Sequence, residues 1–202
     1  MKNYLFILLI CLGCASKKEI VVPKFESKIV SNEKLSCRAI FVDTDKVWLG
    51  MDKGRYGFYD KKKDTLVVKT IQSVSNTTEF RSIAATKDAI FILAVGNPAK
   101  LIKIDKKSLQ ETIVYQEENE KVFYDSMQFV DNLNGFAMGD PTEDCLSFIK
   151  TTDGGNSWEK ISCANLPKVS EGEAAFATSN TNLIVKGKSI FMVSGGKKSR
   201  VF

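Results

Sequence analysis

The chain has 202 residues, with 29 Lys and Arg against 24 Asp and Glu, and it contains no histidine. Without imidazole, Ser-His-Asp triads, His-ligated zinc and imidazole proton shuttles are excluded. Hydrophobic residues make up 44% and charged residues 26% of the chain, a composition typical of folded globular proteins. Four of the cations are arginine and the lysines are scattered, so we expect a solvated surface and no nucleic-acid partner.

The N-terminus has the pattern of an export signal. Lys2 precedes a short apolar run from Tyr4 to Leu12, well below the ~20 residues needed to span a bilayer. The run ends in Gly13 and Cys14, which resembles a bacterial lipobox and implies cleavage before Cys14 and its lipidation. The alternative is an ordinary signal peptide with a chance cysteine. We expect a lipoprotein signal peptide at 1–13 and a lipidated, flexible tether at 14–34.

The remainder of the chain reads as short strands without a helical apolar stripe. Gly, Asn and Asp punctuate the β-rich runs, and regular short strands with turn residues between them indicate an all-β fold. The runs are Ala39–Val42, Val47–Met51, Leu66–Ile71, Ile90–Val95, Met127–Val130, Leu146–Ile149 and Ser189–Val193.

Two features recur along the chain at a period of about 45 residues. A charged residue opens a strand at Arg38, Arg81, Asp125 and Glu173, and an aspartate closes a later strand at Asp60, Asp105 and Asp153. This period with four strands per unit is what one propeller blade requires. Within a domain at 35–202, the expected blades are about 35–75, 78–118, 121–167 and 171–202.

A specific motif occurs at the third of these aspartates. The segment from Thr151 to Trp158 matches the Asp-box pattern, Ser/Thr-x-Asp-x-Gly-x-Ser/Thr-Trp. Asp153 is expected to accept hydrogen bonds from turn N–H groups, Gly155 to supply a positive φ, and Trp158 to pack on a neighbouring sheet. With Thr151 and Ser157, these residues form a structural turn and not a catalytic site.

The Asp-box, the Phe80-Arg81-Ser82-Ile83 opening and the Gly139-Asp140-Pro141 turn resemble sialidase-like Asp-box (BNR) repeat β-propellers. The similarity is greatest to the photosystem-II-stability-factor-like group and to the exported bacterial lipoproteins related to it. The resemblance implies an all-β propeller of four-stranded antiparallel blades. A closed ring would need about seven blades, whereas about 3.5 fit here. We therefore expect an N-terminal fragment of a protein of roughly 330–350 residues; a small four-bladed ring is the alternative.

The charged strand openings form the best candidate site. In a propeller, Arg38, Arg81, Asp125 and Glu173 would lie in equivalent positions around the channel entrance, with Asp140 in the turn after the next strand. Convergent charges of this kind raise the chance of a polar ligand or partner site. The alternative is that they pair with one another or with backbone and only close the rim.

The favoured function is a non-enzymatic assembly or stability factor. We expect it to be lipid-anchored at the bacterial cell envelope, on the outer membrane or the periplasmic face, and to bind a protein or envelope component. The alternative is a sialidase-like glycoside hydrolase, which needs three arginines on a carboxylate, a Tyr/Glu pair and an acid. A redox propeller is a weaker alternative, and no cofactor or metal is expected.

The cysteines give a structural prediction. If the Asp-box hairpin pairs Thr151 with Ser157, then Cys145 and Cys163 face each other across the two strands, near enough for a disulfide. Export favours oxidation, and two buried free thiols are the alternative. Cys37 is expected to remain unpaired and buried.

Overall fold

The computed structural model describes residues 24–176, 180–187 and 189–202. The predicted signal peptide and Cys14 lie outside the described residues. No helix in the described part of the chain is long and apolar enough to cross a membrane.

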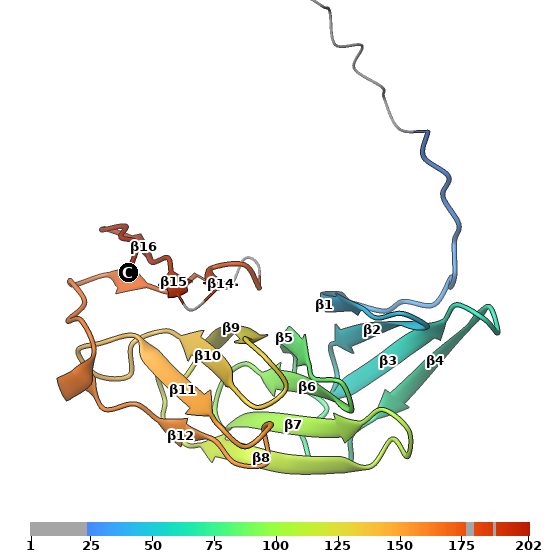
Figure 1. Ribbon diagram of the computed structural model, residues 1–202, viewed down its shortest axis with the longest axis horizontal. Coiled ribbons are helices and arrows are strands. Elements are labelled where there is room, and N and C mark those ends of the chain that lie inside the picture. The colour runs from blue at the N-terminus through green and yellow to red at the C-terminus, as the bar shows by residue number, and fades with distance from the viewer. Residues whose placement is uncertain (1–23, 177–179, 188) are drawn as a thin grey trace, which may run out of the picture.

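Three four-stranded antiparallel sheets follow one another along the chain, each made of four consecutive strands in sequence order (Figure 1). The first has β1 (Cys37–Val42), β2 (Lys46–Met51), β3 (Arg55–Asp60) and β4 (Thr65–Thr70). The second has β5 (Phe80–Ala85), β6 (Ala89–Ala94), β7 (Ala99–Asp105) and β8 (Glu111–Glu117). The third has β9 (Tyr124–Phe129), β10 (Gly135–Gly139), β11 (Ser147–Thr151) and β12 (Glu159–Lys160). The first strands β1, β5 and β9 lie side by side, so the sheets are blades of a β-propeller.

A fourth unit is only partly built. Its strands form two separate pairs: β13 (Glu173–Ala174) with β16 (Gly195–Gly196), and β14 (Leu183–Lys186) with β15 (Ser189–Met192). β14 lies against β9 of the third blade. The described residues thus contain three complete blades and part of a fourth.

The blades are held together by apolar side chains on their facing surfaces. Trp48 and Phe58 of the first blade pack with Ile83 and Ile92 of the second. Phe91 of the second blade packs on Trp158 of the third, with ring centroids 6.3 Å apart. Because these side chains are withdrawn from water at the junctions between sheets, hydrophobic burial stabilises the stacking of blades as well as each blade.

The Asp-box forms the turn between β11 and β12. Asp153 accepts hydrogen bonds from the N–H of Asn156 (2.9 Å) and of Ser157 (3.1 Å), and the Ser157 hydroxyl donates to its second oxygen (2.6 Å). Gly155 has φ of +75°, and a Cβ there would lie 2.3 Å from the Phe91 ring, so only glycine fits. Asp60 and Asp105 also accept two turn N–H groups each, from the residues two and three positions further on, whereas Asp153 accepts from those three and four positions further on.

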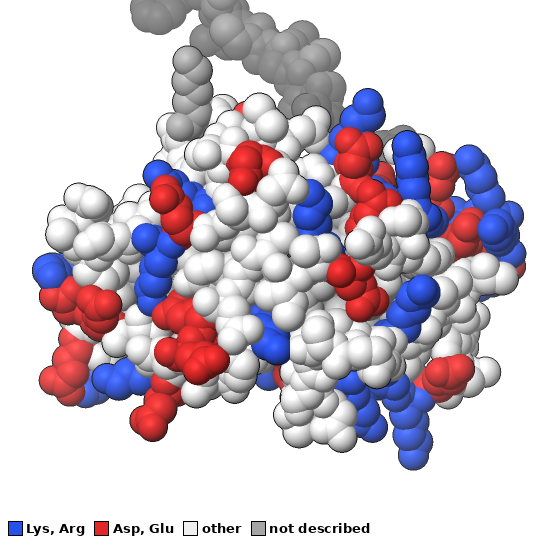
Figure 2. Space-filling view, turned by 90° about the horizontal axis from the view of Figure 1, so that it is seen from below, with Lys and Arg blue, Asp and Glu red and all other residues white. Residues whose placement is uncertain are grey.

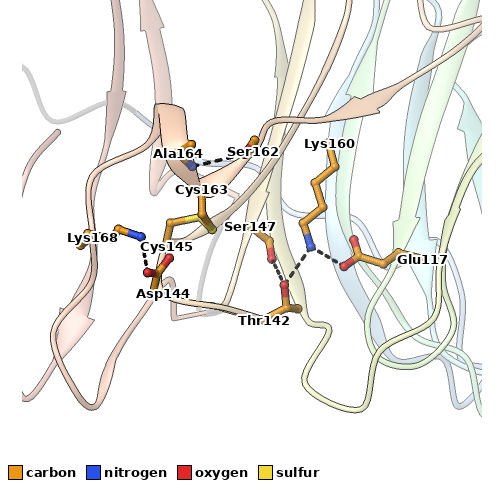
Figure 3. Close-up of a disulfide and its surroundings, with 10 residues drawn as sticks. All are labelled: Glu117, Thr142, Asp144, Cys145, Ser147, Lys160, Ser162, Cys163, Ala164 and Lys168. Atoms are coloured by element: carbon orange, nitrogen blue, oxygen red, sulfur yellow. Dashed lines mark hydrogen bonds and ion pairs between the residues drawn. A yellow bond between two sulfur atoms is a disulfide. The ribbon is translucent and has the colours of Figure 1, made fainter.

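A disulfide joins Cys145 and Cys163, with the Cα atoms 5.4 Å apart (Figure 3). The register argument behind the prediction was wrong by one residue, because the hairpin pairs Lys150 with Glu159 rather than Thr151 with Ser157. β12 ends at Lys160, and Cys163 lies in the 3-10 helix η1 (Cys163–Asn165). The cysteines therefore meet through the segments flanking the hairpin and not as a cross-strand pair.

Cys37 was expected to be buried, and that prediction was wrong. It begins β1 at an exposed position and is the free cysteine of the described residues.

Candidate functional site

The first strands of the three blades carry the same irregularity. Each pairs with the second strand of its blade except for one residue near its start, where the register shifts. Such a β-bulge leaves the extra residue outside the ladder and re-aims its side chain, and bulges are common beside functional sites. The bulged residues are Arg38 in β1, Arg81 in β5 and Asp125 in β9. The structure therefore places these three predicted site residues at equivalent positions.

Asp125 is the most unusual of them. It is 1% exposed, and neither of its carboxyl oxygens has a hydrogen-bond partner in the described residues. Burial, reinforced by the negative charge of Asp140 and opposed by Arg81, raises the pKa of Asp125 to about 8. The carboxyl is therefore mostly protonated at neutral pH. Buried polar groups are nearly always paired, so an unpaired carboxyl calls for an explanation.

Asp140 and Arg81 lie near Asp125 but use their own partners. The Asp140 carboxylate follows β10 and accepts the N–H of Ala175 at 2.8 Å. Both Nε and Nη2 of Arg81 donate to one oxygen of Glu79, at 3.0 and 2.9 Å, and the guanidinium lies 5.6 Å from the centre of the Phe123 ring. We call Arg81, Asp125 and Asp140 the entrance cluster.

Arg38 differs from Arg81 in being free. It is exposed, and it makes no hydrogen bond or ion pair with any described residue. It therefore offers an uncommitted cation one blade away from the entrance cluster.

Glu173 is used inside its own unit. Its side chain is fully buried and accepts bonds from Nε and Nη2 of Arg200, from the Ser194 hydroxyl and from the N–H of Ser170. The ion pair with Arg200 lowers its pKa to about 2. A ligand would have to displace these partners, so we leave Glu173 out of the candidate site and assign it to the stability of the fourth unit.

Asn180 was not singled out from the sequence as a site residue, yet it links two blades. Its side-chain oxygen accepts the Ser82 hydroxyl (2.8 Å) and the N–H of Met127 (2.9 Å), while its Nδ2 donates to the carbonyl of Ile83 (2.9 Å). The amide thus joins β5 to β9 from a position in the fourth unit. A polar residue just before the apolar run at Leu183 was the available signal, but it does not identify the partners.

A second polar network lies between the second and third blades. Glu117 of β8 accepts hydrogen bonds from the hydroxyls of Tyr115 and Tyr124, both 2.8 Å, and forms an ion pair with Lys160 of β12. Lys160 also donates to the Thr142 hydroxyl at 2.8 Å (Figure 3). Burial raises the pKa of Tyr124 far above its usual range. Each of these groups is hydrogen-bonded or ion-paired to another, so the network holds the second and third blades together.

The surface charges do not form one field on the face shown in Figure 2, where basic and acidic side chains lie interspersed. Among the described residues, no cluster of three or more Cys, Asp or Glu side chains is arranged to hold a metal ion. The entrance cluster with Arg38 is therefore the candidate site that the geometry supports.

The fold is shared with solved β-propellers. The chain is similar to a structure described as YCF48 bound to D1 peptide, with a TM-score of 0.51 and 12% identity over 81% of this chain. It is also similar to the RRP9 WD40 repeats (TM-score 0.53, 10% identity, 69% of this chain) and to U3-55K (0.55, 9%, 87%). At these identities the likeness establishes the fold alone. No protein-family profile matches the chain, and no curated protein does.

The chain spans about half the length of these structures, 50%, 42% and 54% respectively. The propeller fold predicted from the repeat is thus confirmed, whereas the length of the complete protein stays a prediction.

Proposed function

We propose that this propeller is a non-enzymatic binding module that holds a protein or envelope component at the channel entrance. The observation that carries the proposal is Asp125, buried with both carboxyl oxygens unpartnered. A group that costs stability and lies in a cluster of charges is a strong candidate for a binding role. The exposed guanidinium of Arg38 adds an unpaired charge in the first blade, at the position equivalent to that of Asp125 in the third blade.

The comparison with known propellers supports a protein partner. One solved structure of the same fold carries a bound peptide, so a propeller of this fold is able to hold a peptide. We propose, on the lipobox-like segment alone, that the module is tethered to the cell envelope through Cys14.

The glycosidase alternative gains no support from the geometry. Three of the four arginines already hold carboxylates of this chain: Arg55 with Asp52, Arg81 with Glu79, and Arg200 with Glu173. Tyr124 is fully buried, and its raised pKa makes it a poor nucleophile at neutral pH. We therefore prefer the binding function.

The test is a comparison of charge variants. A partner is captured from envelope extract on the immobilised chain, purified, and titrated against wild type, Arg38→Glu and the matched control Lys87→Glu, an exposed cation at the other end of the second blade. We expect Arg38→Glu to weaken binding about tenfold and Lys87→Glu to change it by less than about twofold. Equal effects of the two variants, or robust turnover of a fluorogenic sialoside by the wild type, would contradict the proposal.

A further inference from the structure

Within the entrance cluster, no cation pairs with the carboxyl of Asp125. Asp125 is 1% exposed and carries two oxygens that nothing in the described residues contacts by a hydrogen bond. Leaving such a group unsatisfied costs about 1–3 kcal/mol, and more when it is charged. No group of the described chain therefore compensates for the burial of this carboxyl.

The nearest basic side chain does not fill that place. Arg81 is one blade away and influences Asp125 electrostatically, but its Nε and Nη2 both donate to Glu79. Its guanidinium also lies over the Phe123 ring. The chain's own cation is thus committed to Glu79, and it forms no ion pair with Asp125 or Asp140.

Asp140 supplies the second carboxyl and the route to the first. It is partly exposed, and its backbone N–H donates to the carbonyl of Phe123, which precedes the inner strand bearing Asp125. One Asp140 oxygen is held by the N–H of Ala175. Because Asp140 is partly exposed and Asp125 is buried, a long side chain arriving from solvent would meet Asp140 first.

We propose that the entrance cluster takes one cationic side chain of the partner, a lysine or an arginine, between Asp125 and Asp140, and that its arrival releases the proton of Asp125 to solvent. This inference rests on the proposed binding function and names the chemistry of the group that is bound. The charges balance: a neutral carboxyl and a cation become a carboxylate–cation pair and one free proton. The charged groups facing Asp125 are Arg81 from β5 and Asp140 after β10.

The probe that tests this is methylguanidinium, with N-methylurea as a neutral isostere. The ¹³C resonance of the Asp125 carboxyl is titrated between pH 5 and pH 10 with and without each probe. We expect methylguanidinium, and not N-methylurea, to lower the pKa of Asp125. The apparent affinity for methylguanidinium should tighten by up to about 100-fold between pH 6 and pH 9, because only the ionised carboxyl binds. Equal effects of the two probes, or an affinity that is independent of pH, overturn the proposal.

Variants distinguish the cation site from the proposed binding function. Asp140→Asn, which alters a partly exposed side chain, and Asp125→Asn should each abolish methylguanidinium binding, while Asp88→Asn, an exposed carboxyl at the far end of the second blade, should not. Undiminished binding by Asp125→Asn overturns the cation site. If partner capture survives Asp125→Asn but is lost with Arg38→Glu, the cation inference fails and the binding function stands.

Discussion

Replacing Asp125 by Asn should stabilise the protein in alkaline solution. The folded state holds the Asp125 proton with a pKa of about 8, against an ordinary value of 3.8. The stability that this protonation contributes is therefore fully present below about pH 4 and is lost as the pH rises through 8. At about 1.4 kcal/mol per pKa unit, the loss amounts to about 5–6 kcal/mol. Asparagine has the same shape and no charge to bury, so the variant should not show this loss.

The assay is urea unfolding at a series of pH values, followed by fluorescence of Trp48 and Trp158, which are 1% and 8% exposed. The free energies of unfolding of wild type and Asp125→Asn should agree within about 1 kcal/mol at pH 4 and differ by about 5–6 kcal/mol at pH 8.5. Asp88→Asn should follow the wild type within about 0.5 kcal/mol throughout. Parallel curves for wild type and Asp125→Asn would refute the reasoning, since they would mean that this carboxyl is not buried without a partner.

Three further outcomes are expected. Asn180→Ala should lower the free energy of unfolding by about 2 kcal/mol, because it strands backbone and hydroxyl groups on two blades, whereas Asn76→Ala in an exposed loop should leave it unchanged in the same urea titration. Reducing the Cys145–Cys163 disulfide should cost about 3 kcal/mol, measured with and without dithiothreitol; identical curves would contradict a stabilising role. Cys14→Ser should abolish labelling by an alkyne fatty acid and move the protein from the membrane pellet to the supernatant, and an unlabelled wild type would contradict the anchor.

The sequence predicted the fold because each blade repeats its local chemistry. An aspartate at or just after the end of the third strand accepts turn N–H groups at Asp60, Asp105 and Asp153, so a period was visible even where the glycine and tryptophan of the full motif were missing. Arg81 and Asp125 lie 44 residues apart and occupy the same bulge, so spacing alone aligned them.

The spacing did not predict which side chain pairs with each carboxylate. Glu173 was aligned with Asp125, but its carboxylate meets Arg200, which is 27 residues further on and follows no repeat. The strand β8 also escaped prediction, because polar residues interrupt its apolar alternation: it has exposed Thr112 beside exposed Ile113. The short β12 explains the error in the disulfide register, since no alternation extends far enough to fix the pairing.

The state of the entrance cluster depends on a local competition that the alignment does not contain. Glu79 is two residues from Arg81 and captures its guanidinium with two hydrogen bonds, so Asp125 on the adjacent blade is left without a cation. A loss of about 5–6 kcal/mol above pH 8 is comparable with the whole stability of many domains, 5–15 kcal/mol. An uncharged asparagine would avoid it at no steric cost. A carboxyl at this position is explained if its ionised form binds a ligand. The cation that favours the ionised form is then supplied from outside the chain.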